Sequence, residues 1–404
     1  MISVDEARKT VVDSVFPIGV ERVPLLEAHH RVAAADVISN DDIPPFDNSS
    51  MDGFALMAED VQRADQDPVR LKLVAEVPAG DPSGLRLAPD TAAQIMTGAP
   101  VPDGATAVIE QELIQVRNGS IHVTVPVKKG KNIRKRGEDI RAGDTAVRKG
   151  SFLQAAHLGV LASIGASSVE VYKRPKVAFF TTGNELVEVG PALSPGKIRN
   201  SNTYSLFGLI RETHCTPVNL GVVRDDEAAL QEKVVQGLAH DALITSGGVS
   251  VGKYDLILRI LAELQVEQKF WKVNVKPGGP VAFSTYEKAE RKVPVFSLPG
   301  NPVSTVVTFL QFVKPGLEKL MGMQPIRPLL TLKAFLEHEI KKTDKKKNFS
   351  RGILRNEMGR LLVKTTGSQS SGALSSMVAA NCLVLIPEDK EVLKAGDEVE
   401  VELL

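Results

Sequence analysis

The feature that most constrains the fold is the regular alternation of apolar and amphipathic segments between residues 174 and 320. The apolar runs KVAFFTT, PVNLGVV, DALITS and VPVFSL alternate with helix-like segments that include SNTYSLFGLIRET, DDEAALQEKVVQGLA and KYDLILRILAEL. Alternation of this kind favours right-handed βαβ units, because parallel strands need a crossover connection that a helix usually provides. The pattern therefore predicts a central, doubly wound, mostly parallel α/β domain with helices on both faces of its sheet.

The rest of the chain predicts further domains, since 404 residues exceed what one hydrophobic core usually serves. Aliphatic residues recur at helical intervals in VDEARKTVVDSV, VPLLEAHHRVAAADV and SFLQAAHLGVLASIG. Short β-branched runs such as LKLVAEV and SIHVTVPV indicate an inserted β-rich domain, and LLTLKAFL and EVEVELL indicate a C-terminal β domain. The predicted fold class is multidomain α/β plus β: an N-terminal helical region, the β insertion, the α/β domain and the C-terminal domain, at 1–46 with 142–173, 47–141, 174–326 and 327–404.

Charge and cysteine content limit the partners and the compartment. Lysine plus arginine equals aspartate plus glutamate at 49 each, so no global basic field recruits nucleic acid. The only two cysteines, Cys215 and Cys382, are far apart, which argues against a disulfide framework or a structural zinc site and fits a reducing compartment. The N-terminus lacks a signal-peptide pattern, and no apolar run reaches the roughly 20 residues that span a bilayer. We expect a cytoplasmic protein without membrane or nucleic-acid partners.

Each strand of the predicted α/β domain ends in a polar loop, and three of these loops contain glycine. The loops are TTGNE, RDD, TSGGVSVG and LPGNP, at residues 181–185, 224–226, 245–252 and 298–302. Because the carboxyl ends of parallel strands share one edge of the sheet, these loops should converge there. Glycines let backbone N–H groups approach an oxyanion, so this edge is a candidate phosphate site.

Three carboxylates accompany these loops. Glu185, Asp225 and Asp255 would suit a Mg²⁺ ion that bridges protein and phosphates. Each has a simpler interpretation. Asp225 or Asp226 could cap the following helix, Asp255 could serve a helix dipole, and Glu185 could be a solvated loop residue.

The segment from Gly247 to Lys253 also matches GxxxxGK, the first part of a P-loop, between a strand and a helix. Tyr254 follows where a Mg²⁺-binding serine or threonine should stand. A P-loop nucleotidase is therefore disfavoured, although the phosphate-cradling interpretation of the glycines remains.

Lysines provide a second set of signals. Lys272 and Lys276 lie four residues apart, so in an extended segment both ammonium groups would point to the same face, ahead of the rigid turn Pro277-Gly278-Gly279-Pro280. A solvated strand face is the alternative. The lysine-rich run at residues 341–347 is interpreted as an exposed turn between two strands.

The β insertion contains three polar motifs, NSSMDG, MTGAP and NIRKRGED, at residues 48–53, 96–100 and 132–139. The motif at 132–139 contains three cationic residues followed by two carboxylates. On its own it would be interpreted as a surface loop.

Taken together, seven strings resemble one family. IPPFDNSSMDGFA, IMTGAPVP, NIRKRGEDI, TTGNEL, TSGGVSVGKYD, FWKVNVKPGGP and SLPGNPVS occur in this order in the molybdopterin molybdenumtransferases, which include the C-terminal domain of gephyrin. The resemblance covers essentially the whole chain. It implies that the C-terminal domain is β-barrel-like and that the protein is an elongated homodimer, with an active cleft between the α/β domain of one subunit and the β insertion of the other.

The resemblance also implies an activity and residue roles. The family inserts molybdate into adenylyl-molybdopterin, releases AMP and requires Mg²⁺. The implied catalytic residues are Asp52, Asp139, Glu185, Asp225, Asp255, Lys272 and Lys276. Of these, Glu185, Asp225 and Asp255 would bind Mg²⁺, and Lys272 and Lys276 would bind molybdate. The implied substrate-binding residues, with Arg351 assigned to molybdate, are Thr97, Arg134, Ser246, Gly247, Gly248, Pro280, Pro299, Asn301, Pro302, Arg351 and Ser371.

This chain departs from the family pattern at two places. Family members often have lysine where this chain has Gly279, and some carry an arginine that the segment Ser370-Ser371-Gly372-Ala373-Leu374 lacks. Both departures lie on the molybdate side, so the choice between molybdate and tungstate stays open. The alternative functions are a molybdopterin adenylyltransferase and a non-catalytic dimeric scaffold. Other proteins of molybdenum cofactor biosynthesis are possible partners.

Overall fold

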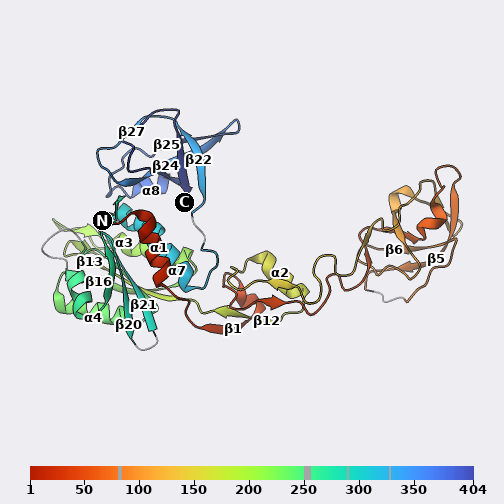
Figure 1. Cartoon of the computed structure of the whole chain (residues 1–404), viewed down its shortest axis with the longest axis horizontal. Helices are drawn as coiled ribbons and strands as arrows, with labels where there is room; N and C mark the ends of the chain where they lie inside the picture. Colours follow the sequence, from red (N-terminus) through yellow and green to blue (C-terminus); the bar gives the residue numbers. More distant parts are fainter. Residues whose placement is uncertain (81–83, 250–255, 289–290, 327–328) are drawn as a thin grey trace.

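The computed structural model describes residues 1–80, 84–249, 256–288, 291–326 and 329–404. The molecule is elongated (Figure 1). The α/β domain and the C-terminal domain lie together at one end, a small linker domain follows, and the β insertion forms a separate distal module at the other end. Both chain termini lie near the junction of the α/β and C-terminal domains.

The α/β domain contains a six-stranded sheet in the order β16-β13-β17-β21-β20-β18. The first four strands are mutually parallel, and β20 pairs antiparallel with both β21 and β18, which confirms the predicted mostly parallel sheet. In sheet order their bounds are Thr216–Val223, Lys176–Thr182, Ala242–Ser246, Arg291–Leu298, Ala282–Lys288 and Glu267–Trp271.

Helices cover both faces of this sheet, as predicted. One apolar core joins α1, α3, α6, a single π-helical turn and α7 to one face, and a second core joins α4 and α5 to the other. Their bounds in that order are Val4–Ser14, Asn202–Glu212, Pro302–Thr308, Phe309–Val313, Lys314–Leu320, Glu227–Leu238 and Leu256–Glu263. The N-terminal helix α1 therefore packs in the core of the α/β domain, where Val4, Ala7 and Val11 are fully buried.

The linker domain corrects one predicted helix. Helix α2 (Ala155–Ser163) forms as expected, but VPLLEAHHRVAAADV is not helical. Strand β1 (Val20–Pro24) pairs instead with β12 (Ser168–Tyr172), and only a short 3₁₀ turn follows at Leu25–Ala28. Pro24 has no N–H to donate within a helix, and His30 adopts a φ of 58°, which a right-handed helix excludes.

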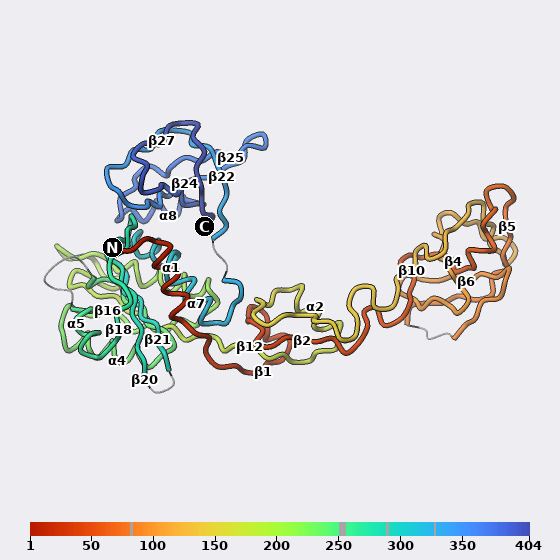
Figure 2. Tube along the Cα trace, viewed as in Figure 1, coloured from red at the N-terminus to blue at the C-terminus, as the bar shows by residue number. Residues whose placement is uncertain are grey.

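Two segments that run side by side, one leading to the distal module and one leading back, connect it to the linker domain (Figure 2). Strand β2 (Val37–Ile38) pairs with β11 (Thr145–Val147), and the Ile43 N–H donates to the Ile140 carbonyl at 2.7 Å. Beyond this neck the module has its own six-stranded sheet in the order β7-β4-β6-β5-β9-β8. Those strands span Ala107–Glu110, Gly53–Leu56, Thr91–Ile95, Val69–Val77, Ser120–Val123 and Gln115–Arg117.

Alternate residues of β4 enter two separate cores on the two faces of this sheet. Phe54 and Leu56 pack in one core and Ala55 in the other, as the two-residue period of a strand requires. The module therefore has apolar cores that do not depend on the rest of the chain.

The C-terminal domain is a closed barrel. Strands β24, β25, β22, β28 and β26 pair in sequence, and an additional β24–β26 pairing closes the ring, which confirms the predicted barrel-like domain. Their bounds in that order are Lys347–Glu357, Arg360–Thr365, Thr331–Leu336, Glu398–Leu403 and Cys382–Ile386. The short strand β19 (Val275–Lys276) leaves the α/β domain and pairs in parallel with β24.

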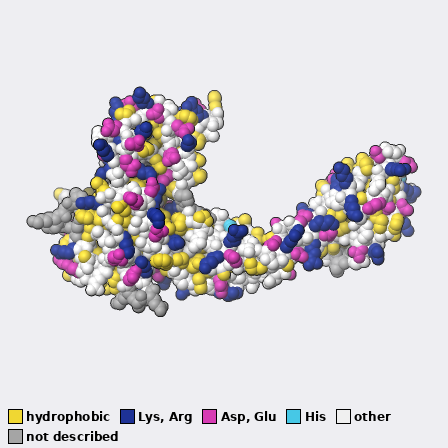
Figure 3. Space-filling model, viewed as in Figure 1, with side chains coloured by type: hydrophobic (Ala, Val, Ile, Leu, Met, Phe, Trp, Pro, Cys, Tyr) yellow, Lys and Arg dark blue, Asp and Glu magenta, His cyan; other side chains and the backbone are white. Residues whose placement is uncertain are grey.

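The lysine-rich run does form a turn, between β23 (Ile340–Lys341) and β24. It is not uniformly exposed, because Lys342 is buried and its Nζ donates to the carbonyls of Lys346, Pro387 and Glu388. Elsewhere, positive and negative side chains are interspersed over the visible surface (Figure 3). In the described part of the chain, no helix is long and apolar enough to span a membrane.

Candidate active site

A cavity of about 670 Å³ lies at the carboxyl ends of the parallel strands. All four predicted strand-end loops contribute to it, so the predicted convergence is confirmed. The cavity is lined by Thr182, Gly183, Glu185, Leu186, Ile198, Arg199, Asn200, Ser201, Asn202, Asp225, Leu230, Ser246, Gly247, Gly248, Val249, Leu256, Pro280, Pro299, Gly300, Asn301 and Pro302.

The loop after β17 requires glycine at two successive positions. Gly247 and Gly248 have φ values of 98° and 68°, in the region that side chains other than glycine rarely adopt. A Cβ on Gly247 would also lie 2.4 Å from the Thr182 carbonyl oxygen. Both glycines line the cavity, so the chain passes along its wall without a side chain at these two positions. The Gly247 N–H donates to the Leu298 carbonyl at 3.1 Å, so within this pair the Gly248 N–H is the candidate donor to an anion.

Two of the three predicted Mg²⁺ ligands line this cavity. Asp225 Oδ1 accepts a hydrogen bond from Thr182 Oγ1 at 2.6 Å, and Glu185 is exposed within the same wall. The capping alternative applies to the neighbouring residue, because Asp226 Oδ1 accepts from the Ala229 N–H at 2.9 Å as the N-cap of α4. Asp255 and Tyr254 lie outside the described residues.

Within the described ranges, no group of three or more His, Cys, Asp or Glu side chains is placed to hold a metal ion. Two carboxylates that line one cavity still fit a Mg²⁺ ion that takes its other ligands from water and substrate phosphates, because Mg²⁺ commonly binds protein through one or two carboxylates.

The cavity also contains residues that the sequence patterns did not single out. Strand β15 (Ile198–Arg199) and the start of α3 place Arg199, Asn200 and Asn202 in its wall. Asn202 is buried, and its Nδ2 donates to Ser246 Oγ and to the Gly300 carbonyl, at 2.9 and 2.8 Å. Its buried Oδ1 has no hydrogen-bond partner among the described residues, so this acceptor is left over at the cavity wall. The available sequence signal was the run of cap-type residues, Asn-Ser-Asn, at the start of α3.

The predicted geometry of Lys272 and Lys276 is wrong. Lys272 has a φ of 68° and lies just after the end of β18, so the chain turns there, whereas Lys276 lies in β19. The two lysines therefore do not share one extended face. The Lys272 ammonium lies 3.9 Å from the ring centroid of Trp271, a cation–π contact. Lys276 Nζ donates to Asp344 Oδ2 of the C-terminal domain at 2.7 Å. Neither residue lines the large cavity.

Lys276 and Arg351 do share a second cavity, of about 440 Å³, against the barrel. Arg351 is only 1% exposed. Its guanidinium donates to Ser376 Oγ and to the carbonyls of Ser368 and Ser370, which orders the loop that contains Ser371. The Ser371 carbonyl accepts from the Val303 N–H at 3.0 Å, so this loop contacts the first turn of α6 beside the large cavity. Burial lowers the pKa of Arg351.

The distal module gathers the other predicted residues. Asp52 Oδ1 accepts from the Thr97 N–H at 2.7 Å and from Thr97 Oγ1 at 2.8 Å. These hydrogen bonds, the backbone one first, lower the pKa of Asp52. Arg134 is exposed in β10 (Ile133–Arg134), which pairs with β3 (Asn48–Ser49), and Asp139 is exposed near the neck.

Comparison with known families gives three consecutive matches. The MoeA N-terminal region (domain I and II) matches residues 2–165, a probable molybdopterin binding domain matches 178–319, and the MoeA C-terminal region (domain IV) matches 333–404. The chain is also 36% identical over 406 residues to a molybdopterin molybdenumtransferase of Haemophilus influenzae, across 100% of this chain and 98% of that protein. The chain belongs to the molybdopterin molybdenumtransferase family.

The chain is also similar over its whole length to other members of the molybdopterin molybdenumtransferase family. The Bacillus subtilis member is 34% identical over 410 residues, covering 100% of this chain and 94% of that protein. The crystal structure of the molybdopterin biosynthesis moeA protein from Pyrococcus horikoshii OT3 matches with a TM-score of 0.84 and 33% identity over the whole of both chains. The inferred family and fold class are confirmed, and the family is one of transferase enzymes.

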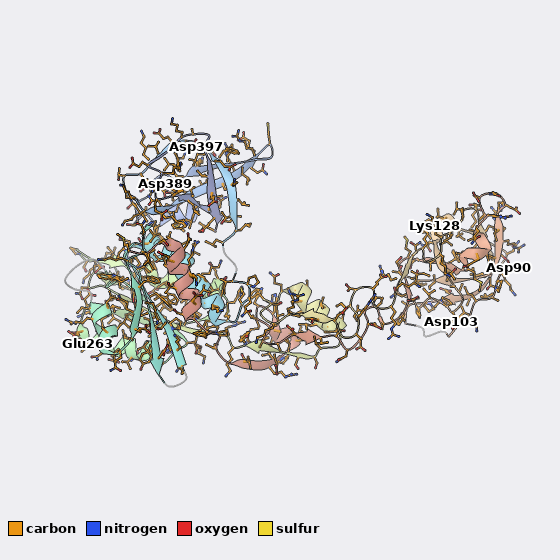
Figure 4. All side chains as sticks on the ribbon, in the orientation of Figure 1. Asp90, Asp103, Lys128, Glu263, Asp389 and Asp397 are labelled. Atoms are coloured by element: carbon orange, nitrogen blue, oxygen red, sulfur yellow. The ribbon has the colours of Figure 1, made fainter. Side chains whose placement is uncertain are left out.

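In this family member, the two groups of predicted site residues lie far apart within one chain. Figure 4 shows Asp90, Asp103 and Lys128 on the distal module and Glu263 on the α/β domain, at opposite ends of the molecule. Asp389 and Asp397 mark the barrel. Because the neck and the linker domain separate the distal module from the large cavity, Asp52 and Thr97 do not contribute to the cavity of their own chain.

Proposed function

We propose that this chain inserts molybdate into adenylyl-molybdopterin with release of AMP, in a Mg²⁺-dependent reaction of molybdenum cofactor biosynthesis. Family membership supports the pathway. The observation that carries the reaction is the cavity whose wall combines the side-chain-free positions Gly247 and Gly248 with two carboxylates, Glu185 and Asp225. This pairing suits a phosphoanhydride, which needs hydrogen-bond donors for its oxygens and a cation to offset its charge.

In this proposal, the loop after β17 and the turn at Pro299–Pro302 bind the pterin and its phosphate. Asn202 holds these two segments together, since its Nδ2 donates to Ser246 on one and Gly300 on the other. Glu185 and Asp225 would hold Mg²⁺, which would stabilise charge that develops on the departing AMP. Thr182 orients Asp225 by donating to its Oδ1.

Molybdate would bind on the barrel side of the site. Lys276 and Arg351 line one cavity there, and Ser371 lies on the loop that Arg351 orders. Much of the donor capacity of Arg351 is used on that loop, so we propose a positioning role for it. Lys276 is the more exposed of the two and can exchange Asp344 for an anion.

The site would be completed by a second copy of the chain. The distal module presents Asp52, Thr97, Arg134 and Asp139 far from its own cavity, and a homodimer would bring them to the cavity of the partner. Asp52 would enter such a site as a carboxylate, held by two hydrogen bonds from Thr97 that favour its ionised form and lower its pKa.

The test is release of AMP from adenylyl-molybdopterin when molybdate is added. Glu185→Gln and Asp225→Asn should each reduce kcat by about 100-fold or more, as loss of electrostatic stabilisation at a reacting phosphate does. Glu263→Gln, which changes an exposed carboxylate on α5, should leave kcat unchanged.

The outcomes separate the alternatives. Consumption of ATP with free molybdopterin would indicate an adenylyltransferase, and a dimer without either activity would indicate a scaffold. Full activity in both the Glu185→Gln and Asp225→Asn variants would refute the assigned roles.

A further inference from the structure

The turn at residues 276–280 lies between the two cavities and has no side chain at Gly279. Pro280 lines the large cavity, whereas Lys276 and Pro277 line the cavity against the barrel. A Cβ built on Gly279 would lie 3.4 Å from Lys346 Nζ. An ammonium group from the lysine-rich turn of the C-terminal domain therefore occupies the space beside this turn of the α/β domain.

This placement of Lys346 is supported by an ordered loop. Asp344 accepts from Lys276 Nζ through Oδ2 and from the Lys346 N–H through Oδ1, at 2.7 and 3.1 Å. The buried ammonium of Lys342 donates to three backbone carbonyls, including that of Lys346. Pairing of β19 with β24 then fixes the loop against the turn. The loop is therefore held in place through contacts that leave the Lys346 side chain itself unused.

The two lysines at this turn differ in their partners. The Lys276 ammonium is neutralised by Asp344. Lys346 Nζ, on a half-buried residue, has no hydrogen-bond or ion-pair partner in the part of the chain that the structure describes. A half-buried ammonium without a described partner, beside a turn whose ends line the two cavities, favours an anionic ligand.

We propose that Lys346 is an oxyanion-binding residue whose ammonium group lies beside Gly279. The inference rests on the proposed function, because molybdate is the anion that this site would take. A lysine ammonium is a compact point charge with three donors, which suits a tetrahedral dianion without demanding one orientation. Gly279 is part of the arrangement, since a longer side chain there would compete with Lys346 for the same space.

The experiment measures binding of sodium molybdate and sodium tungstate to the full-length protein by calorimetry, without the pterin substrate. Lys346→Gln should raise Kd for both anions by about tenfold or more, the loss expected for one charge-assisted hydrogen bond. Lys346→Arg, which keeps the charge, should stay close to the unsubstituted protein.

The matched control is Lys345→Gln, which removes the same charge from the next residue of the same loop. Lys345 is exposed, and only its carbonyl makes a described contact, with Asn274 Nδ2. This variant should bind both anions almost normally. If Lys345→Gln and Lys346→Gln raised the Kd for the anions equally, binding would depend only on the overall positive charge of the loop, and the proposal would be overturned.

Three other results would also overturn it: no anion binding by the unsubstituted protein, unchanged Kd in Lys346→Gln, or an equal loss in Lys346→Arg. The proposed reaction is judged separately by AMP release. If molybdate triggers AMP release with the same KM for molybdate in Lys346→Gln, the reaction stands and the role of Lys346 fails. If Lys346 binds molybdate but no AMP is released, the role of Lys346 stands and the proposed reaction fails.

Discussion

Asp225 and Asp226 are adjacent in the chain and have different environments. The N-cap position directs the Asp226 side chain to the free N–H of Ala229 at the start of α4. Asp225, one residue earlier, instead accepts from Thr182 on the neighbouring strand and lines the cavity. Sequence could show that one of the two would cap the helix, but only the backbone path after β16 decides which.

Thr97 donates two hydrogen bonds to Asp52, and their effect on the pKa of Asp52 can be measured. The Thr97 backbone N–H and hydroxyl both donate to Asp52 Oδ1 and lower its pKa. In Thr97→Val the hydroxyl is lost and the N–H remains, so the pKa of Asp52 should rise part of the way to its ordinary value. Titration of the Asp52 carboxyl by NMR measures the change, and Thr97→Ser, which keeps a hydroxyl, is the control.

The sign of the pH effect follows from the lowered pKa. The hydrogen bonds favour ionised Asp52, so their contribution to stability is present above the unfolded pKa of about 4 and is lost as the pH falls through the folded pKa. If Asp52 acts as a carboxylate, the acid limb of activity should move to higher pH in Thr97→Val. An unchanged Asp52 pKa in that variant would contradict the assignment.

The π-helical turn at Phe309–Val313 connects two domains through Gln311. Gln311 Nε2 donates to Glu402 Oε2 at 2.7 Å, and Arg8 from α1 donates to Glu402 Oε1 at 2.9 Å and to Gln311. Glu402 lies on β28 of the barrel and is only 4% exposed. One carboxylate of the barrel is therefore held by two elements of the α/β domain.

Removal of Arg8 should loosen this attachment. Arg8→Ala leaves the buried Glu402 without its cation and should destabilise the barrel's docking by about 2 kcal/mol, the usual loss for a hydrogen bond to a charged group. Hydrogen exchange along β28 should become faster in this variant. Lys9→Ala, which removes an exposed ion pair with Asp13 on the same helix, should have almost no effect. Equal protection of β28 in both variants would rule out the attachment.

Elements were predictable where burial repeats along the chain. Strands β13, β16, β17 and β21 were all predicted from their apolar runs. The runs of β13, β17 and β21 are buried on both faces of the sheet, whereas β16, at the sheet edge, is mostly half-buried. β18 and β20 were not predicted, because they mix polar and aromatic residues and pair antiparallel at the sheet edge. The segment at 23–37 has helical periodicity, but pairing with β12 and the turn at His30 override it.

Side-chain geometry was less predictable than the elements. The carboxylates and glycines were found because strand ends must converge, a rule that depends on topology alone. Lys272 was misplaced because a single positive φ redirects the chain, and no sequence pattern marks it. Lys346 was interpreted as solvated because its position beside Gly279 depends on how two consecutive domains pack together, which no local sequence pattern shows.

At the scale of the whole molecule, the separation of the distal module from the cavity predicts complementation between subunits. Glu185→Gln and Asp52→Asn should each be inactive alone. If each site uses Asp52 of one subunit and Glu185 of the other, a mixed dimer contains one intact site. An equal mixture that has exchanged subunits should recover about a quarter of normal AMP release.

The control is a mixture of two variants that alter the same side of the site, Glu185→Gln with Asp225→Asn. Every site in those mixed dimers is damaged, so activity should stay absent. Failure of the first mixture to recover activity, with subunit exchange confirmed by mass, would place the whole site within one chain.

The position of α1 has a consequence for how the protein is made. Its apolar face, with Val4, Ala7 and Val11, packs against α7 and the neighbouring π-helical turn. On the ribosome this helix is made long before its partner α7, which is complete only after residue 320 has been synthesised. The distal module, with cores of its own, can fold in the meantime. The nascent chain therefore carries α1 without its packing partner until that point of translation, so the apolar face of this helix stays uncovered during most of synthesis.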